Sequence, residues 1–205
     1  MRVLSAKQFT TSPNACPSCG THIGSSESCG RCSFSLEACQ QLAAEELKPL
    51  LSAPLGYFTD ARSQPLPNEQ ARKIEERIRA EIKKRFPAHP AIIVFFDWEG
   101  ASLSITEKAF ALMNLAHFDP EIDPRKSVLF TFGVSEEEVE ATATPGYRIE
   151  PFLPHEELSE LLLGVLPQDP RPEEIVDFGR LMESYGEVLK QRSEIAMKAQ
   201  KESKR

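Results

Sequence analysis

The stretch Ala91-Ile-Ile-Val-Phe-Phe-Asp97 decides the fold of this chain of 205 residues. Its six consecutive apolar residues leave no polar face, which is typical of a strand buried on both sides of a sheet. The stretch Val128-Leu-Phe-Thr-Phe132 has the same character and predicts a second buried strand. Between the two, Ser104 and Glu107 have the spacing of a capping box, so a helix is expected to begin there.

The segments outside these strands predict further elements of both kinds. Residues 68–86 place apolar side chains at helical spacing, and the extended segment 57–60 precedes them. Residues 139–144 alternate apolar with polar side chains, which predicts a half-exposed strand paired with the preceding strand through the acidic turn 134–137. Two more amphipathic helices are expected, over residues 155–165 and 173–190.

Together these elements predict an α/β fold, with a mixed sheet of four or five strands flanked by helices on its faces and preceded by a small zinc ribbon. A helix capped by Ser35 is expected over Leu36–Leu47, with a linker over residues 48–56. The predicted divisions are a zinc ribbon (1–34), a helix and linker (35–54), the α/β domain (55–190) and a basic helical tail with a frayed end (191–205).

Four cysteines form two Cys-x-x-Cys pairs, Cys16 with Cys19 and Cys29 with Cys32. Each spacing lets one tight turn direct two thiolates at the same ion, and four thiolates complete a tetrahedral structural zinc site with no open position for catalysis. Disulfides and a redox pair are the alternatives. The redox pair is disfavoured because no strand–helix context surrounds either Cys-x-x-Cys pair. Cys39 is expected to be a small buried apolar residue rather than a ligand.

The charge is distributed unevenly along the chain. The formal net charge is −7, with +2 in residues 1–33 and +4 in residues 190–205, so residues 34–189 carry −13. An acidic body argues against a cationic nucleic-acid binder, and the loop 20–28 has no Lys or Arg to contact phosphate. No apolar leader or membrane span is visible in the sequence, so a cytoplasmic protein is expected, in which thiols stay reduced.

From about residue 55 to residue 190 the chain resembles the TPM domain family, named after thylakoid-lumen, photosystem-repair and receptor-modulator proteins. The resemblance rests on Gly56-Tyr-Phe-Thr-Asp60, on Ala109-Phe-Ala-Leu-Met-Asn114 and above all on the turn Pro145-Gly-Tyr-Arg-Ile-Glu150. The family's Trp-Gly-Ile-Gly is absent, and Leu115-Ala-His-Phe-Asp-Pro120 stands there instead. Some members of the family resemble acid phosphatases, and some bind calcium or magnesium. The resemblance also implies that Asp60 occupies an acidic position that is common in the family.

Carboxylates near the predicted strand ends are the candidate site. Asp97 and Glu99 follow the strand 91–96, and ligands of parallel sheets gather at the carboxyl ends of strands. With Asp60 they could hold Ca²⁺ or Mg²⁺ through their oxygens. The alternative is that each Asp caps a turn or a helix. Glu150 is another candidate, and it could equally anchor its turn by hydrogen bonds.

Two functions remain open on the sequence alone. The first is a non-enzymatic interaction or assembly module that binds another protein or complex, because the zinc site is closed and no nucleophile or phosphate-cradling motif is present. The second is a divalent-cation-dependent phosphatase or related hydrolase that uses Asp60, Asp97 and Glu99.

Overall fold

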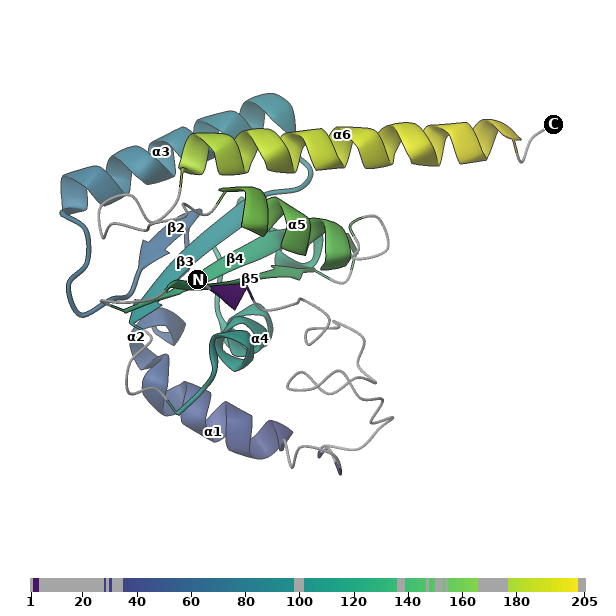
Figure 1. Ribbon diagram of the computed structural model, residues 1–205. Helices are drawn as coiled ribbons and strands as arrows, with labels where there is room; N and C mark the ends of the chain where they lie inside the picture. Colours follow the sequence, from purple (N-terminus) through teal and green to yellow (C-terminus); the bar gives the residue numbers. More distant parts are fainter. Residues whose placement is uncertain are drawn as a thin grey trace.

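A mixed β-sheet lies between two layers of helices in the computed structural model (Figure 1). The structure describes residues 2–3, 28, 30, 35–97, 102–135, 139–146, 148–149, 153, 155–165 and 177–202. Its elements in chain order are β1 (Arg2–Val3), α1 (Leu36–Glu46), α2 (Lys48–Leu51), β2 (Phe58–Asp60), α3 (Asn68–Arg85), β3 (Ala91–Asp97), α4 (Ile105–Leu115), the 3₁₀ turn η2 (Pro124–Lys126), β4 (Val128–Val134), β5 (Val139–Pro145), α5 (His155–Val165) and α6 (Phe178–Glu202).

The α/β class and the mixed sheet predicted from the sequence are confirmed. The strand order is β1-β5-β4-β3-β2, in which β2, β3 and β4 are parallel and β5 runs antiparallel to β4. The two-residue strand β1 pairs in parallel with β5 at the edge. The segment 91–97 is the central strand that its sequence predicts, because the side chains of its residues 91–96 are all buried.

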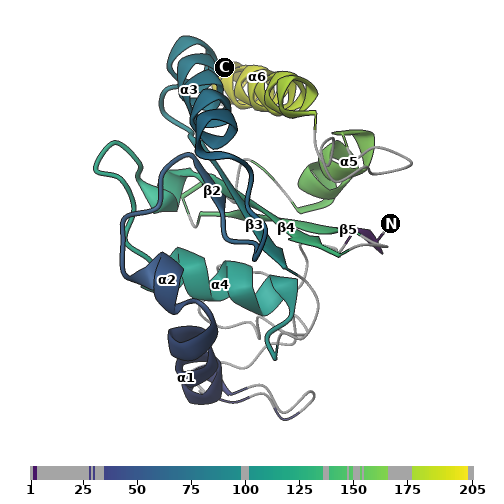
Figure 2. The same cartoon turned by 90° about the vertical axis from the view of Figure 1, so that its left-hand side faces the viewer.

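The two parallel crossovers cover opposite faces of the sheet. The chain leaves β2 through α3, which lies with α6 on one face, and leaves β3 through α4, which lies with α1 and α2 on the other (Figure 2). Both crossovers step in the same direction across the sheet, so they have opposite hands, and one is the uncommon left-handed form. Because the chain turns away to opposite faces after β2 and β3, a crevice opens between the carboxyl ends of these neighbouring strands.

Aromatic rings fill the face covered by α6. Tyr185 on α6 contacts Phe130 on β4 and Phe86 after α3, with ring centroids 5.6 and 5.0 Å apart. Phe178 at the start of α6 makes edge-on contacts with Phe58 and Phe95 at 5.6 and 6.1 Å. Such edge-to-face pairs add to the free energy gained from apolar burial, so this face is a closed aromatic core.

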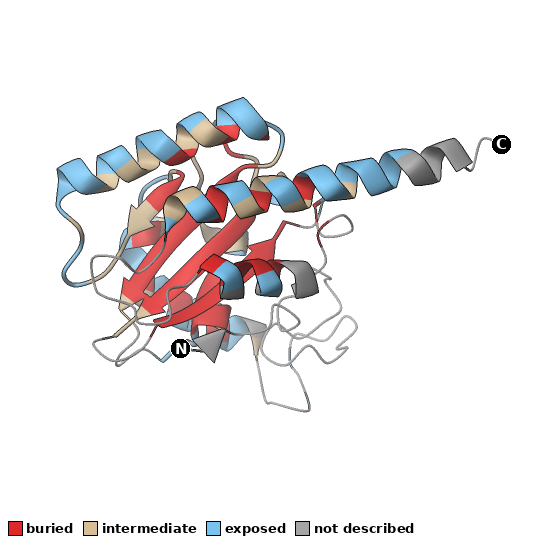
Figure 3. Ribbon diagram, turned by 45° about the horizontal axis from the view of Figure 1, so that its top comes forward, coloured by how far each residue is buried: buried red, intermediate tan, exposed pale blue. Residues whose placement is uncertain are grey.

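Strand β5 corrects one prediction. Its alternating sequence predicted a half-exposed strand, but every residue of β5 is buried, including Glu140, Thr142 and Thr144 (Figure 3). The reason is tertiary, because α4 and α5 both pack against β5 and leave no solvent-facing side. Threonine is β-branched and suits a strand, so its presence did not mark an exposed face.

Helix boundaries agree with the sequence in most places and differ in two. The helices over residues 36–46, 68–85 and 155–165 are confirmed, and the capping box of Ser104 and Glu107 at the start of α4 is formed on both sides. The predicted linker contains the short helix α2. At the other end, α6 continues to Glu202, through most of the segment assigned to the basic tail.

The four cysteines predicted to bind zinc, Cys16, Cys19, Cys29 and Cys32, lie outside the described residues. Cys39 is 4% exposed on α1 and carries a free thiol, as expected for a small buried residue. Burial raises the pKa of this thiol to about 11, with a smaller contribution from Glu107. A thiol that stays protonated at neutral pH is a poor nucleophile and a poor metal ligand.

Candidate functional site

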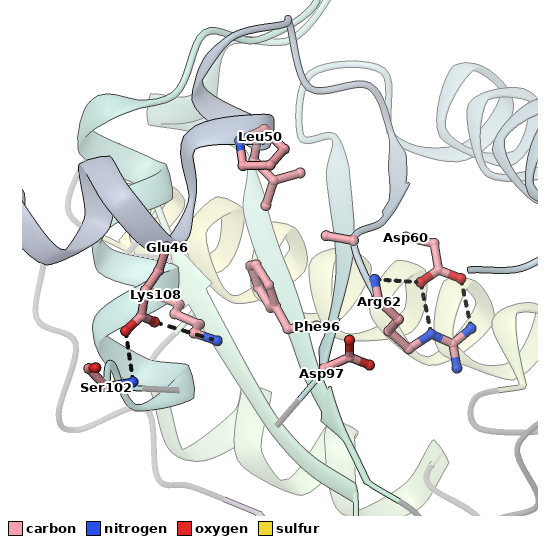
Figure 4. Close-up of a pocket in the computed structure, with 10 residues that line it drawn as sticks. Glu46, Leu50, Asp60, Arg62, Phe96, Asp97, Ser102 and Lys108 are labelled. Carbon is pink, nitrogen blue, oxygen red and sulfur yellow. Dashed lines mark hydrogen bonds and ion pairs between the residues drawn. The ribbon is translucent and has the colours of Figure 1, made fainter. Parts of the chain in front are cut away.

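A cavity of about 670 Å³ lies at the crevice between the carboxyl ends of β2 and β3 (Figure 4). Its walls come from the ends of these two strands, from the junction of α1 with α2, and from the start of α4. The lining residues are Glu46, Pro49, Leu50, Asp60, Ala61, Arg62, Phe96, Asp97, Ser102 and Lys108. Five of the ten are ionisable, which is why this cavity is the candidate site.

Asp60 and Arg62 form a two-pronged pair on one wall. Arg62 donates from Nε to Oδ1 of Asp60 at 2.8 Å and from Nη2 to Oδ2 at 2.7 Å. The side chain of Arg62 is 9% exposed and that of Asp60 is 3% exposed. The backbone N–H of Leu66 also donates to Oδ2, at 2.9 Å. Burial tends to raise the pKa of Asp60, but these hydrogen bonds outweigh it and the pKa is lowered. Asp60 is therefore an ionised carboxylate that is already engaged by partners.

Asp97 lies between Arg62 and Lys108 in the cavity (Figure 4). Its Oδ2 accepts a hydrogen bond from the backbone N–H of Ser63, which ties the loop after β2 to the end of β3. Within the described part of the chain, its Oδ1 accepts no hydrogen bond. Asp97 thus has one carboxylate oxygen that a ligand in the cavity can use.

The predicted cation ligands come together in part. Asp60 and Asp97 line the same cavity, whereas Glu99 lies outside the described residues. Among the residues that the structure does describe, no three His, Cys, Asp or Glu side chains converge as a metal site requires. Arg62 donates to both carboxylate oxygens of Asp60, so a cation bound to either oxygen would have to compete with it.

Glu46 is a site residue that the sequence analysis missed. It is the last residue of α1, and its Oε1 accepts hydrogen bonds from the backbone N–H groups of Ser102 at 2.7 Å and Leu103 at 3.3 Å. These contacts attach α1 to the segment that leads into α4. A glutamate at the end of a helix is usually exposed to solvent, so no sequence pattern predicted that Glu46 would make these contacts.

Lys108 is the second site residue that was missed. It lies on α4 with only 7% of its surface exposed, and its Nζ is 4.0 Å from Oε2 of Glu46 and 5.0 Å from the centre of the Phe96 ring. Burial lowers its pKa, and the carboxylates of Glu46 and Asp97 oppose that effect without cancelling it. The sequence did carry a signal, because Lys108 falls on the apolar stripe of α4 at i+3 from Ile105 and i−4 from Leu112.

The turn on which the family resemblance rests most lies against the segment before β4. The backbone N–H of Gly146 donates to the carbonyl of Ser127 at 2.8 Å. A Cβ at Gly146 would lie 2.2 Å from the carbonyl oxygen of Pro124 and 2.5 Å from Arg125, so backbone proximity excludes a side chain there. Glu150, the candidate in this turn, lies outside the described residues.

None of the helices described is both long enough and apolar enough to cross a membrane. Comparisons with protein-family models, with curated proteins and with solved structures found no match to this chain.

Proposed function

We propose that this chain is a zinc-ribbon-bearing TPM-domain protein of the cytoplasm that acts as a non-enzymatic interaction or assembly module, with another protein or complex as its partner. The observation that carries the proposal is the pairing of Asp60 with Arg62. The acidic position that the family resemblance marks for cation chemistry holds the loop 61–66 in place through Arg62 and Leu66. Glu46 likewise uses its carboxylate to attach α1 to the segment before α4.

The zinc part of the proposal rests on the spacing of Cys16, Cys19, Cys29 and Cys32. Elemental analysis of the purified full chain should find about one zinc ion per molecule. A double Cys16→Ser, Cys19→Ser variant should lose the metal. Cys39→Ser is the matched control and should keep it, because Cys39 is buried in α1. Native protein that contains no zinc would refute this part.

The interaction part is tested with the same variants. Chemical cross-linking of the full chain at native expression level, followed by mass spectrometry, should identify a partner cross-linked to the ribbon segment. Cys39→Ser should retain the partner and the Cys16→Ser, Cys19→Ser variant should lose it. If both variants keep the partner equally, the ribbon is not the binding element.

A divalent-cation-dependent phosphatase or related hydrolase is the second candidate. The observation that favours it is Asp97, which lines the cavity and whose Oδ1 accepts no hydrogen bond from the described residues. In this case Mg²⁺ or Ca²⁺ should raise the melting temperature of the protein and support turnover of a phosphomonoester.

Asp97→Asn is the decisive variant for this second candidate, because it removes the charge of the accessible carboxylate and leaves the Asp60–Arg62 pair intact. It should abolish the cation effect and the turnover. Wild-type protein that shows neither effect would leave the interaction module as the better account, whereas cation-dependent turnover lost in Asp97→Asn would establish the hydrolase.

A further inference from the structure

Lys108 is placed in the cavity by the geometry of α4. The side chains of a helix lean towards its N-terminus, so a lysine in the first turn directs its amine back to the start of the helix. Here the neighbouring positions on the stripe, Ile105, Ala109 and Leu112, are buried in the core. The long side chain of Lys108 therefore runs along the core and its amine emerges in the cavity beside Phe96.

The amine of Lys108 has room in the cavity, and its ion pair with Glu46 is long. An ammonium group carries three hydrogen-bond donors. In the part of the chain that the structure describes, Nζ of Lys108 makes no hydrogen bond, and its nearest carboxylate oxygen, on Glu46, is 4.0 Å away. Most lysines with so little exposure are held by direct hydrogen bonds, because a buried charge is costly without them. This amine instead faces an open cavity of about 670 Å³.

The surroundings of Lys108 favour the uncharged amine. Burial removes water from the ammonium, which penalises the charged form. Glu46 from α1, Asp97 from β3 and the ring of Phe96 favour the charged form, while Arg62 after β2 repels it. Burial is the largest of the effects on its pKa, and the pKa is lowered. An amine that loses its proton more readily than an exposed lysine is a better nucleophile at neutral pH.

We propose that Lys108 is a reactive amine that binds a small uncharged aldehyde or ketone as a Schiff base in this cavity. The nitrogen attacks the carbonyl carbon and a proton moves from nitrogen to oxygen, which gives a carbinolamine. Loss of one water molecule then forms the C=N bond, so no oxidant or reductant is needed. Glu46 and Asp97 line the same cavity, and their carboxylates can accept and donate these protons.

The lining selects an uncharged ligand. Three carboxylates, of Glu46, Asp60 and Asp97, face the cavity together with Arg62 and Lys108. Arg62 is already bound by Asp60, so an anionic oxo acid finds no unpaired guanidinium there. Leu50 and Phe96 supply apolar surface for a short carbon chain. None of the residues that line this site belongs to the segment 1–34, so the proposal does not depend on the function proposed above.

Trapping with a reductant tests the proposal on the full chain. The protein is incubated with a low concentration of propanal and cyanoborohydride, and the modified lysines are located by peptide mass spectrometry. Lys73 is an internal control, because its side chain is 66% exposed on α3. At pH 7 the labelling rate of Lys108 should exceed that of Lys73, because the lowered pKa of Lys108 leaves a larger fraction of its amine uncharged.

A pH series separates a reactive amine from a merely accessible one. The ratio of labelling at Lys108 to labelling at Lys73 should fall as the pH rises, because Lys108 becomes fully uncharged first. Lys108→Arg should remove the fast label and leave the labelling of Lys73 unchanged. Labelling of Lys108 no faster than that of Lys73, or a ratio that is constant from pH 7 to pH 10, would overturn the proposal. Faster labelling with pyruvate than with propanal would overturn the preference for an uncharged ligand.

Discussion

The two faces of the sheet are built differently. The face under α6 is aromatic, since Phe58, Phe95 and Phe130 point towards Tyr185 and Phe178. The face under α4 carries smaller side chains, among them the buried residues Ile92, Val94 and Leu129, and Thr131, Thr142 and Thr144, which share that side by register. The large rings close one face, and the charged crevice opens where the strands end.

This difference shows how one fold separates stability from chemistry. Rings that contact each other edge to face bury much apolar area and need few polar partners. At the strand ends the backbone N–H groups and the charged side chains must find partners, and they do so through Asp60, Arg62 and Glu46. We therefore expect substitutions on the aromatic face to lower stability most, and those in the crevice to act through specific pairs.

The largest effect is expected for Tyr185→Ala. Tyr185 is completely buried, its ring contacts Phe86 and Phe130, and its hydroxyl donates to the carbonyl of His89 at 3.2 Å. Loss of a buried aromatic side chain should lower the free energy of unfolding by about 4 kcal/mol, measured by urea denaturation. Tyr185→Phe is the control and should cost about 1 kcal/mol, the value of one hydrogen bond. A loss below about 2 kcal/mol for Tyr185→Ala would contradict a closed aromatic core.

The second largest effect is expected for Arg62→Ala. This change leaves the buried carboxylate of Asp60 without its charged partner and should lower stability by about 3 kcal/mol at pH 7. Asp60→Asn should cost less, because the asparagine oxygen can still accept a hydrogen bond from Arg62 and the carboxylate of Asp97 also stabilises the guanidinium. Equal losses in both variants would show that the pair itself, rather than the stranded carboxylate, determines the effect.

The same pair predicts a pH dependence. The pKa of Asp60 is lowered in the folded protein, so its contribution to stability is complete above the pKa of the unfolded chain, near pH 4, and is lost as the pH falls through the lower folded value. Denaturation followed from pH 6 to pH 2 should show a shallower loss of stability in Asp60→Asn than in the wild type. Parallel curves would contradict this assignment.

A smaller effect is expected for Ser104→Ala. The Ser104 hydroxyl accepts a hydrogen bond from the backbone N–H of Glu107 at 3.2 Å and caps α4 at the edge of the crevice. Its loss should cost about 1 kcal/mol in thermal or urea unfolding. Ser104→Asp is the control and should retain most of the stability, because aspartate is also a good N-cap residue.

The smallest effect is expected for Met197→Ala on α6. The side chain of Met197 is 55% exposed. The C-terminal part of α6 extends past the sheet (Figure 1). Its truncation should change the free energy of unfolding by less than about 0.5 kcal/mol. Met182→Ala, on the same helix but 2% exposed, should cost about 3 kcal/mol. Similar losses in the two variants would mean that the distal part of α6 is also packed.

Local patterns were sufficient for most of the fold. The apolar stretch 91–96 predicted a central strand, and Ser104 with Glu107 predicted the start of α4, because periodicity and capping depend on residues that are near in sequence. The alternation of apolar and polar residues in β5 led to the wrong prediction of a half-exposed strand, because a local pattern does not show which helices pack on each face of a strand. Cysteine spacing predicted the zinc site, and that remains a prediction.

The candidate site divides in the same way. Asp97 was predicted because it follows the strand 91–96, and Asp60 because the family resemblance marks it at the end of an extended segment. Parallel strands bring such residues to one edge. The other charged residues of the site could not be found in that way. Arg62 is near Asp60 in sequence, but no sequence pattern predicts that the two side chains pair. Glu46 contacts Ser102 and Lys108, which lie more than fifty residues further along the chain.

The sequence by itself determined the class of the fold, the central strand, the helix start at Ser104 and the acidic edge of the sheet, since these follow from local side-chain patterns. Only the tertiary structure decided that the crossovers take opposite faces, that β5 is buried on both sides and that Lys108 shares a cavity with Glu46 and Asp97. The physical reason is that burial and charge pairing depend on groups that packing brings together. The distance between two such groups in space cannot be read from their separation along the chain.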